Sequence, residues 1–325
     1  MLRYRLLGHT GLRVSEFALG TMRFDDPVEA ARIIDTYAEV GGNFLDTASA
    51  YGESEAILGR VLRARDRFVL GTKYTLSRDA TDPNAAGNHR KNLVLSLEQS
   101  LRRLRTDYVD VYWVHVWDRH TPIEETMRAL DDVVRAGKAL AIGISDAPAW
   151  VIARANTLAQ SRDRTPFAAV QVPYNLLERG IERELLPMAE AFGLTVTAWS
   201  PLAGGALSPG AGRATTPSEL AAVAAVTHVA SGLGVAAEQV ALAWTRQRSR
   251  AVLPILGVRT AEQLAGNLAA ARLRLPADAV RVLDDAVPFD RGFPADFVAE
   301  CDASPMVYGA AVDRVDVDDS GPRIR

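Results

Sequence analysis

Short apolar runs alternate with longer amphipathic stretches along most of this chain. The short runs end in turn-forming residues, which is typical of buried strands, whereas residues 27–40 place Val28, Ala31, Ile34 and Tyr37 on one helical face. Strands are predicted at residues 17–19, 43–46, 68–73, 109–114, 139–144, 168–172, 195–199 and 251–255. Helices are predicted at residues 27–40, 54–63, 92–104, 123–136, 149–160, 182–192, 237–247 and 261–269.

The alternation of strand and helix predicts a parallel sheet with right-handed crossovers. Eight such strands indicate an α/β fold of the (β/α)8 TIM-barrel type, and residues 1–325 are interpreted as one domain. A doubly wound sheet is the competing architecture, but its phosphate-binding pattern GxGxxG is absent after the first strand. Residues 3–7 and 12–17, separated by a turn that contains glycine, predict a hairpin ahead of the barrel.

Three segments are more than plain connections. Residues 74–90 are rich in Asp, Asn and Gly, and residues 201–217 are rich in Gly, Ala and Ser. Long ordered loops at the active face of a barrel commonly form lids or binding loops. The tail at about residues 288–325 carries three Phe residues before an acidic end, and we expect residues 315–325 to be frayed.

Composition narrows the range of partners. The net charge of −3 provides no basic stripe for nucleic acid, and no apolar run is long enough to span a membrane. The single cysteine, Cys301, excludes an internal disulfide framework, and the first residues lack the apolar core of a signal peptide. The sequence therefore predicts a cytoplasmic protein without a nucleic-acid or membrane partner, and it predicts no metal site.

Ionisable side chains follow the predicted strands at one end. Asp46 ends the second strand, Tyr51 lies in the next loop, Lys73 ends the third strand and His115 follows the fourth. The carboxyl ends of barrel strands form one rim, where barrel enzymes have their active sites. Taken alone, Asp46 is more often a turn cap and Tyr51 more often a packed ring. Lys73 favours a chemical role, because Arg outnumbers Lys heavily in this chain and only Lys can be tuned.

In this order and context, the four side chains match the catalytic tetrad of the aldo-keto reductases one by one. The chain resembles that family from residue 4 to about residue 275. The resemblance implies hydride transfer from NADPH (forming NADP+), with NADH less favoured, to a small aldehyde or ketone, with keto-sugars among the candidates. It also implies that Tyr51 is the general acid with a pKa lowered by Lys73, that Asp46 pairs with Lys73, and that His115 orients the carbonyl. The hairpin would close the bottom of the barrel, and the first part of the tail would cover the substrate cleft.

The same resemblance implies a set of cofactor contacts. They comprise Gly20, Thr21 and Met22 after the first strand; Ser145, Asp146 and Gln171 at the carboxamide; Trp199, Ser200, Pro201 and Leu202 after the seventh strand; and Gly257, Arg259, Gln263 and Asn267 at the adenosine half. Relatives often carry Asn or Arg in place of Asp146, for which a turn-forming role is the alternative. Arg259 favours a 2′-phosphate, and the helix N-terminus after it is a candidate phosphate site. Gly266 stands where relatives often have Glu.

Other functions remain open from the sequence. Lys73 could be the Schiff-base amine of a barrel aldolase. The chain could also be an NAD-dependent sugar or alcohol dehydrogenase, or a redox-sensing binding subunit with slow turnover. Met22, Phe24, Trp117 and Tyr174 are expected near the substrate. The oligomeric state is not predicted.

Overall fold

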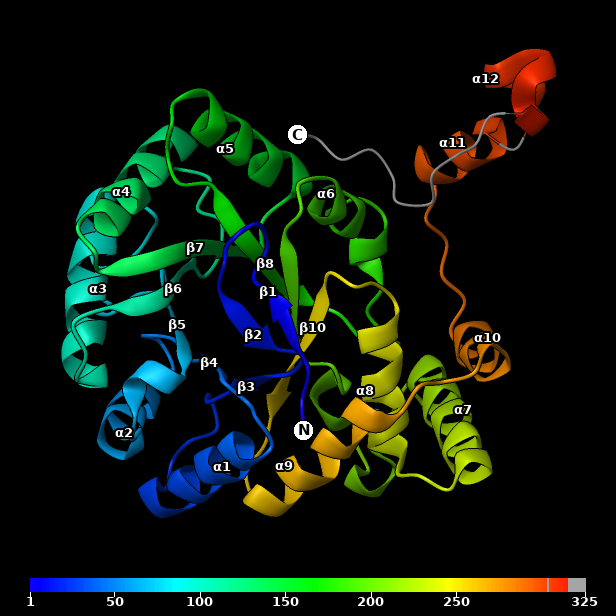
Figure 1. Ribbon diagram of the computed structural model, residues 1–325, viewed down its shortest axis with the longest axis horizontal. Helices are drawn as coiled ribbons and strands as arrows, with labels where there is room; N and C mark the ends of the chain where they lie inside the picture. Colours follow the sequence, from blue (N-terminus) through cyan, green and yellow to red (C-terminus); the bar gives the residue numbers. More distant parts are fainter. Residues whose placement is uncertain (303, 315–325) are drawn as a thin grey trace.

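The computed structural model describes residues 1–302 and 304–314, and Figure 1 shows strands gathered inside a ring of helices. The barrel strands are Ala18–Gly20 (β3), Phe44–Asp46 (β4), Val69–Tyr74 (β5), Val109–Val114 (β6), Ala139–Ser145 (β7), Phe167–Pro173 (β8), Thr195–Trp199 (β9) and Val252–Gly257 (β10). They close in the order β10-β3-β4-β5-β6-β7-β8-β9, and each neighbouring pair is parallel. The predicted (β/α)8 barrel is confirmed.

Helices surround the barrel, except for the last two, which lie apart from it (Figure 1). Their bounds are Pro27–Glu39 (α1), Ser54–Val61 (α2), Arg90–Leu104 (α3), Ile123–Arg135 (α4), Ala149–Ser161 (α5), Leu185–Ala191 (α6), Pro217–Leu233 (α7), Ala237–Gln247 (α8), Ala261–Leu268 (α9), Ala277–Ala286 (α10), Ala295–Asp302 (α11) and Pro305–Tyr308 (α12). Short 3-10 helices lie at Arg65–Arg67 (η1), Gly180–Glu182 (η2), Ala203–Gly205 (η3), Pro209–Ala211 (η4), Ala269–Arg272 (η5) and Gly309–Arg314 (η6). The helix predicted at residues 182–192 is shorter than expected, because η2 ends at Glu182, a turn follows, and α6 begins only at Leu185.

Two apolar clusters fill the molecule, one inside the barrel and a larger one between the strands and the helices. The inner cluster includes Phe44 and the fully buried Trp113. A Cβ on Gly143 would lie 2.3 Å from a ring carbon of Trp113, and one on Gly71 would lie 2.7 Å from its indole nitrogen. Interiors are too closely packed to absorb such contacts, so these two glycines make room for the indole on either side of β6.

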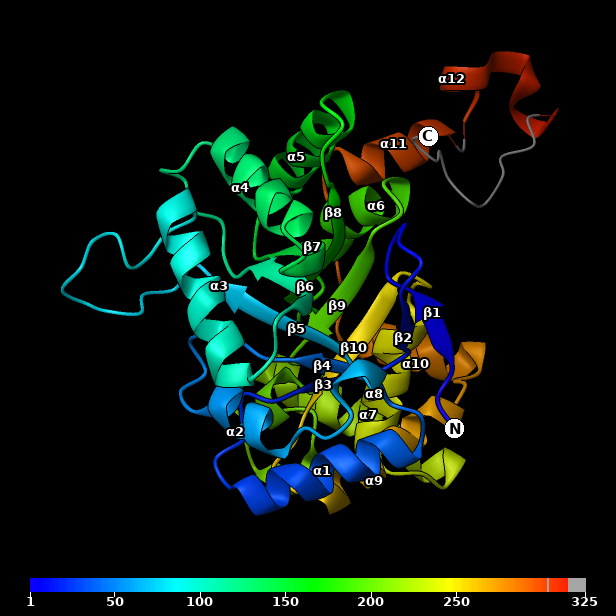
Figure 2. The ribbon, with the colours of Figure 1, turned by 60° about the vertical axis from the view of Figure 1, so that its left-hand side comes forward.

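The N-terminal hairpin closes the amino end of the barrel. Its strands, Tyr4–Leu6 (β1) and Arg13–Ser15 (β2), are antiparallel. Leu7 and Val14 are fully buried in the inner cluster, and the N–H of Gly8 donates to the hydroxyl of Thr195, the first residue of β9, at 2.8 Å. Figure 2 shows the hairpin at one end of the barrel. The expected hairpin is therefore present.

Helix α7 lies in a stretch for which no helix was expected from the sequence. This helix is rich in Ala and has apolar residues on several sides, so no amphipathic period stands out. Its start nevertheless carries a clear signal, because Thr216 and Glu219 form a reciprocal capping box and Pro217 is the first helical residue. Within residues 1–302 and 304–314, no single helix is long and apolar enough to cross a membrane. The pair of α7 and α8 reaches that length and composition only when taken together, with a bend of 100° between them.

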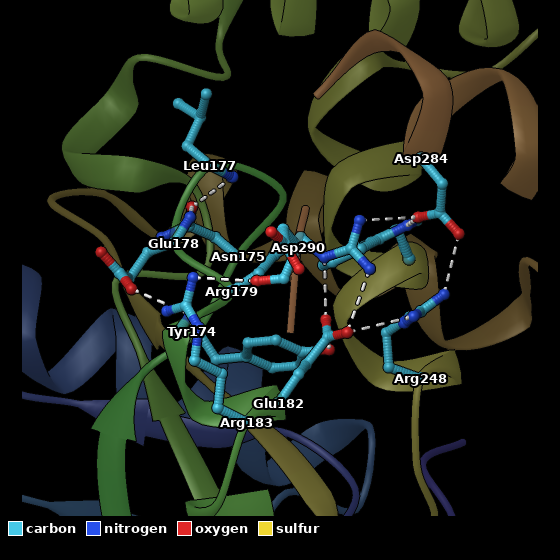
Figure 3. Close-up of polar contacts among 12 residues, drawn as sticks. Tyr174, Asn175, Leu177, Glu178, Arg179, Glu182, Arg183, Arg248, Asp284 and Asp290 are labelled. Carbon is cyan, nitrogen blue, oxygen red and sulfur yellow. Dashed lines mark hydrogen bonds and ion pairs between the residues drawn. The ribbon is translucent and has the colours of Figure 1, made fainter. Parts of the chain in front are cut away.

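After α10 the chain is held against the outer helix layer and then leaves it. The guanidinium groups of Arg179 and Arg183 lie 5.0 and 4.7 Å from the ring centroid of Phe289. Arg183 also donates to the carbonyl of Asp290 at 3.0 Å (Figure 3). Beyond this point α11 and α12 project away from the barrel (Figure 1 and Figure 2).

The described tail does not follow the expectation that its first part covers the substrate cleft. Phe289 is held beside α6, and this outward anchor sends the following helices away from the barrel. Phe293 and Phe297 are accordingly 85% and 51% exposed. The expectation of a frayed end at residues 315–325 lies outside the described residues.

Candidate active site

Four ionisable side chains meet at the carboxyl end of the barrel. Asp46 ends β4, Lys73 lies in β5, His115 directly follows β6, and Tyr51 lies in the loop between β4 and α2. The ammonium of Lys73 donates to the Asp46 carboxylate at 2.6 Å and to the Tyr51 hydroxyl at 3.2 Å. The rings of Tyr51 and His115 meet edge to face with centroids 5.6 Å apart. Side chains that are distant in the sequence thus form one connected group.

The centre of this group is the buried ion pair of Lys73 and Asp46. Lys73 is fully buried, Asp46 is 4% exposed, and the ammonium also donates to the carbonyl of Thr47 at 2.9 Å. Burial alone lowers the pKa of Lys73, but the charge of Asp46 and the contacts with Asp46 and Tyr51 together outweigh burial and leave this pKa above its usual value. The amine is therefore held as an ammonium ion.

Two opposing effects act on the Tyr51 hydroxyl. Burial raises its pKa, and the ammonium of Lys73 lowers it. Lys73 thus acts on Tyr51 in the expected direction, but burial is the larger effect, so the pKa of Tyr51 is raised overall. Tyr51 consequently keeps its proton at neutral pH.

His115 presents a neutral imidazole. Burial and, to a smaller extent, the charge of Lys73 lower the pKa of His115 to about 4. Its backbone N–H donates to the Tyr74 carbonyl and the Thr75 hydroxyl, each at 3.2 Å. Its Nδ1 is buried and has no hydrogen-bond partner in the part of the chain that the structure describes. A neutral ring with an unpartnered nitrogen can bind and orient a polar group.

Hydroxyl side chains hold the strand ends from behind, and sequence reasoning missed two of them. The hydroxyl of Ser54 lies 2.7 Å from that of Thr21 and 3.0 Å from that of Thr47. Thr21 also donates to the carbonyl of Asp46 at 3.2 Å. Thr47 and Ser54 flank the Asp and Tyr in the sequence, and this run of small hydroxyl residues was the available signal.

Two residues expected at the carboxamide have partners within the protein. The amide of Gln171 in β8 donates to Asp46 at 3.0 Å, and the carboxylate of Asp146 accepts from the indole of Trp199 at 3.2 Å. Asp146 has a φ of 47°, so its backbone adopts the turn conformation that was the alternative reading of this residue. Burial raises the pKa of Asp146. Ser145, its neighbour, is 1% exposed.

The first turn of α9 is already hydrogen-bonded by the protein. The Glu29 carboxylate accepts from the N–H of Ala261 at 2.8 Å, and the Thr260 hydroxyl accepts from the N–H of Gln263 at 3.2 Å. The side chain of Gln263 accepts from the N–H of Arg259 at 2.9 Å. These N–H groups are therefore not free to bind a phosphate. This finding differs from the sequence-based expectation, in which the start of the helix was a candidate phosphate site. The exposed guanidinium of Arg259 has no partner among the described residues and remains able to meet an anion.

The four residues expected near the substrate differ in their exposure to solvent: two are accessible and two are buried. Met22 is 55% exposed, and the half-buried ring of Trp117 meets that of Trp150 edge to face at 5.5 Å. Phe24 and Tyr174 are buried, and the Tyr174 hydroxyl donates to the carboxylate of Glu182 at 2.7 Å. Tyr174 is thus not part of a substrate wall, because its ring faces the helices.

Two hollows lie away from the tetrad. One of about 330 Å³ is lined by Tyr174, Arg179 and Phe289, and one of about 880 Å³ lies beside the hairpin and is lined by Tyr4 and Arg246 among others. Neither includes a tetrad residue. The candidate active site is therefore defined by the side chains at the barrel rim and not by either of these two hollows.

The sequence comparison agrees with the fold and with the side chains at the rim. The model of the Aldo/keto reductase family matches residues 16–288. The chain belongs to this family. The family prediction is thereby confirmed, and this aldo/keto reductase is an oxidoreductase that acts on carbonyl groups with a nicotinamide cofactor, NADH or NADPH.

Curated relatives cover most of this aldo/keto reductase. It is 41% identical to the norsolorinic acid reductase stcV of Emericella nidulans, over 89% of this chain and 82% of that protein. It is 33% identical to the putative aryl-alcohol dehydrogenase AAD14 of Saccharomyces cerevisiae, over 92% of this chain and 90% of that protein. It is 35% identical to the aldo-keto reductase ausK of Aspergillus calidoustus, over 91% and 85%.

The rim of the barrel fits a nicotinamide dinucleotide. The ring of Trp199 is 37% exposed at the end of β9, which suits stacking against a planar group. At the end of β10, a Cβ added to Gly257 would meet nothing within 4 Å, so there is open space beside Arg259. A flat aromatic face and an open edge with a free cation are what the two halves of such a cofactor require.

Proposed function

We propose that this aldo/keto reductase uses NADPH to reduce an aldehyde or ketone, with Tyr51 as the general acid. The observation that carries the proposal is the position of the Lys73 ammonium, which contacts both Asp46 and the Tyr51 hydroxyl. A buried cation beside a phenol favours the phenolate that forms when the proton leaves. The same contacts argue against a Schiff-base role, because a paired ammonium is a poor nucleophile.

Each tetrad residue has a distinct part in this mechanism. When bound, a reduced nicotinamide would supply the hydride. Tyr51 gives its proton to the carbonyl oxygen as negative charge develops there, and Lys73 stabilises the resulting phenolate. Asp46 keeps Lys73 charged and in place. His115, neutral at the working pH, orients the carbonyl through a hydrogen bond.

The cofactor contacts proposed on this chain follow the rim. Trp199 would lie against the nicotinamide, with Ser145, Asp146 and Gln171 near its carboxamide. Arg259 would read the 2′-phosphate of NADPH, because a guanidinium forms charge-assisted hydrogen bonds with phosphate oxygens. The absence of a partner for this guanidinium among the described residues supports that assignment.

Aromatic carbonyl compounds are the substrate class that we favour. The name of one relative, the putative aryl-alcohol dehydrogenase, supports this choice. On this chain, the paired indoles of Trp117 and Trp150 provide an aromatic surface for a planar substrate. We also propose a cytoplasmic location. Nicotinamide cofactors are available there, and Cys301, the one cysteine of the sequence, would stay reduced.

A carbonyl panel tests this function. The purified protein is assayed with NADPH and with NADH against aryl aldehydes and ketones, aliphatic ketones of similar size and keto-sugars, following the oxidation of the cofactor. We expect the highest kcat/KM with NADPH and an aryl carbonyl. If only keto-sugars were turned over, keto-sugars would replace aryl carbonyl compounds as the substrate class. A preference for NADH would replace NADPH with NADH as the proposed cofactor. Binding of cofactor without turnover of any carbonyl would favour a sensing subunit.

A further inference from the structure

The loop that carries Tyr51 is held from behind by Arg103, a residue of α3 outside the tetrad. The guanidinium of Arg103 donates to the carbonyl of Ser49 at 3.5 Å and to the carbonyl of Gly52 at 3.1 Å. These two carbonyls lie on either side of Tyr51 in the chain. One planar guanidinium thus bridges the loop that presents the proposed acid, and its fixed fork of donors suits this geometry.

Close packing of α2 against α3 makes this contact possible. A Cβ on Gly59 of α2 would lie 2.2 Å from the carbonyl oxygen of Arg103, so a side chain at position 59 would push the two helices apart. The glycine therefore brings the end of α3 up to the loop. Arg103 is 28% exposed at its side chain, which places its guanidinium partly out of bulk water.

Glu55 anchors the guanidinium on its inner side. Glu55 is fully buried, and its Oε2 lies 3.7 Å from Nη1 of Arg103. This oxygen has no hydrogen-bond partner within the described residues, and its ion-pair partner is the guanidinium of Arg103. The other oxygen accepts from the hydroxyl of Thr72 at 2.6 Å, and Thr72 precedes Lys73 in β5. Glu55 therefore joins Arg103 to the strand of the tetrad lysine.

We propose that Arg103 is a positioning residue for carbonyl reduction, with Glu55 as its buried anchor. Together they connect the loop of Tyr51 to the strand of Lys73 on the side away from the reacting groups. They keep the Tyr51 hydroxyl at 3.2 Å from the Lys73 ammonium, the distance on which the acid depends. This inference rests on the proposed role of Tyr51.

The test compares Arg103→Met with Arg102→Met. Arg102 is the neighbouring residue of α3, is exposed, and has no side-chain hydrogen bond or ion pair among the described residues, which makes it a matched control. We expect Arg103→Met to lower kcat about 10- to 100-fold, the effect of a small misplacement of a catalytic group. KM for the carbonyl should change little. Arg102→Met should keep the wild-type values.

The pH profile separates positioning from a loss of stability. When Tyr51 moves away from Lys73, the pKa of Tyr51 rises. The high-pH limb of the kcat/KM profile should therefore shift to higher pH in Arg103→Met. Arg103→Lys keeps one donor and should recover part of kcat. Glu55→Gln keeps the contact with Thr72 but loses the charge, and should lower kcat severalfold with a shift in the same direction. If Arg103→Met does not fold, Glu55→Gln decides in its place.

Wild-type kcat and an unshifted limb in Arg103→Met would overturn the proposal, as would an equal loss in Arg102→Met. Tyr51→Phe, measured alongside, keeps the two proposals apart. Full turnover in Tyr51→Phe would show that Tyr51 is not the general acid, and the positioning role of Arg103 would then have no basis. A large loss in Tyr51→Phe together with wild-type behaviour in Arg103→Met would overturn the positioning role alone.

Discussion

The ammonium of Lys73 and the carboxylate of Asp46 form an ion pair of 2.6 Å between two side chains that are almost fully shielded from solvent. Such a pair differs from a surface pair, because each charge depends on the other for stabilisation that water would otherwise provide. Gln171 extends the contact, so that the pair connects β5 and β4 with β8 on the far side of the barrel. Stability and the proposed chemistry therefore rest on the same atoms.

Breaking this pair should cost much of the stability of the fold. Lys73→Met and Asp46→Asn are each expected to lower the free energy of unfolding by about 3–5 kcal/mol, because each leaves one buried charge unpaired. The double variant should lose less than the sum of the two. Urea unfolding of the four proteins measures this coupling. The exposed pair of Arg154 and Glu124 is the control, and strictly additive losses at the buried pair would contradict the expectation.

Replacing the proposed acid should affect catalysis and little else. Tyr51→Phe removes only the hydroxyl, so kcat for carbonyl reduction should fall by about 10²–10⁴-fold, as for other general acids. Cofactor affinity and the thermal midpoint should stay near the wild-type values. Steady-state kinetics together with cofactor titration provide the comparison, and near wild-type kcat would remove Tyr51 from this role.

His115 should make stability depend on pH in a defined window. Its pKa is lowered by burial to about 4 in the folded chain, against about 6.5 in an unfolded one. Between these values the unfolded chain binds more protons, so stability is fully present above about pH 6.5 and is lost as the pH falls towards about 4. The loss is at most about 3 kcal/mol.

The matched variant for this pH effect is His115→Asn, which has no ring to titrate. Its free energy of unfolding should decline less than that of the wild type across the same window. Urea unfolding at a series of pH values measures both curves. Parallel curves would show that burial of His115 does not lower its pKa.

Arg259 should discriminate between the two nicotinamide cofactors. Arg259→Ala loses a charge-assisted contact worth about 1.5–3 kcal/mol, which corresponds to roughly 10–150-fold weaker NADPH binding. NADH binding should scarcely change, because NADH lacks the 2′-phosphate. Dissociation constants from fluorescence quenching decide the point. Arg281→Ala, an exposed arginine of α10, is the control, and equal losses for the two cofactors would assign Arg259 no part in reading the phosphate.

The sequence by itself was sufficient to predict the barrel and the meeting of the four proposed tetrad side chains at its rim. Strand and helix periods are local properties of the chain, and a parallel barrel brings all strand ends to one rim, so Asp46, Lys73 and His115 could be placed together before any distance was known. Helix α7 shows the limit of periodicity, because its Ala-rich sequence lacks a polar face even though its capping box at Thr216 is readable.

Only the tertiary structure decided which groups contact the tetrad side chains and the residues proposed to bind the cofactor. Asp46 and Gln171 are 125 positions apart and Glu29 and Ala261 are 232 apart, so no local pattern links them. Their contacts arise from strand register and helix packing, which depend on the whole set of side chains in the core. The net pKa of Tyr51 likewise required burial as well as neighbours, and the sequence supplied only the neighbours.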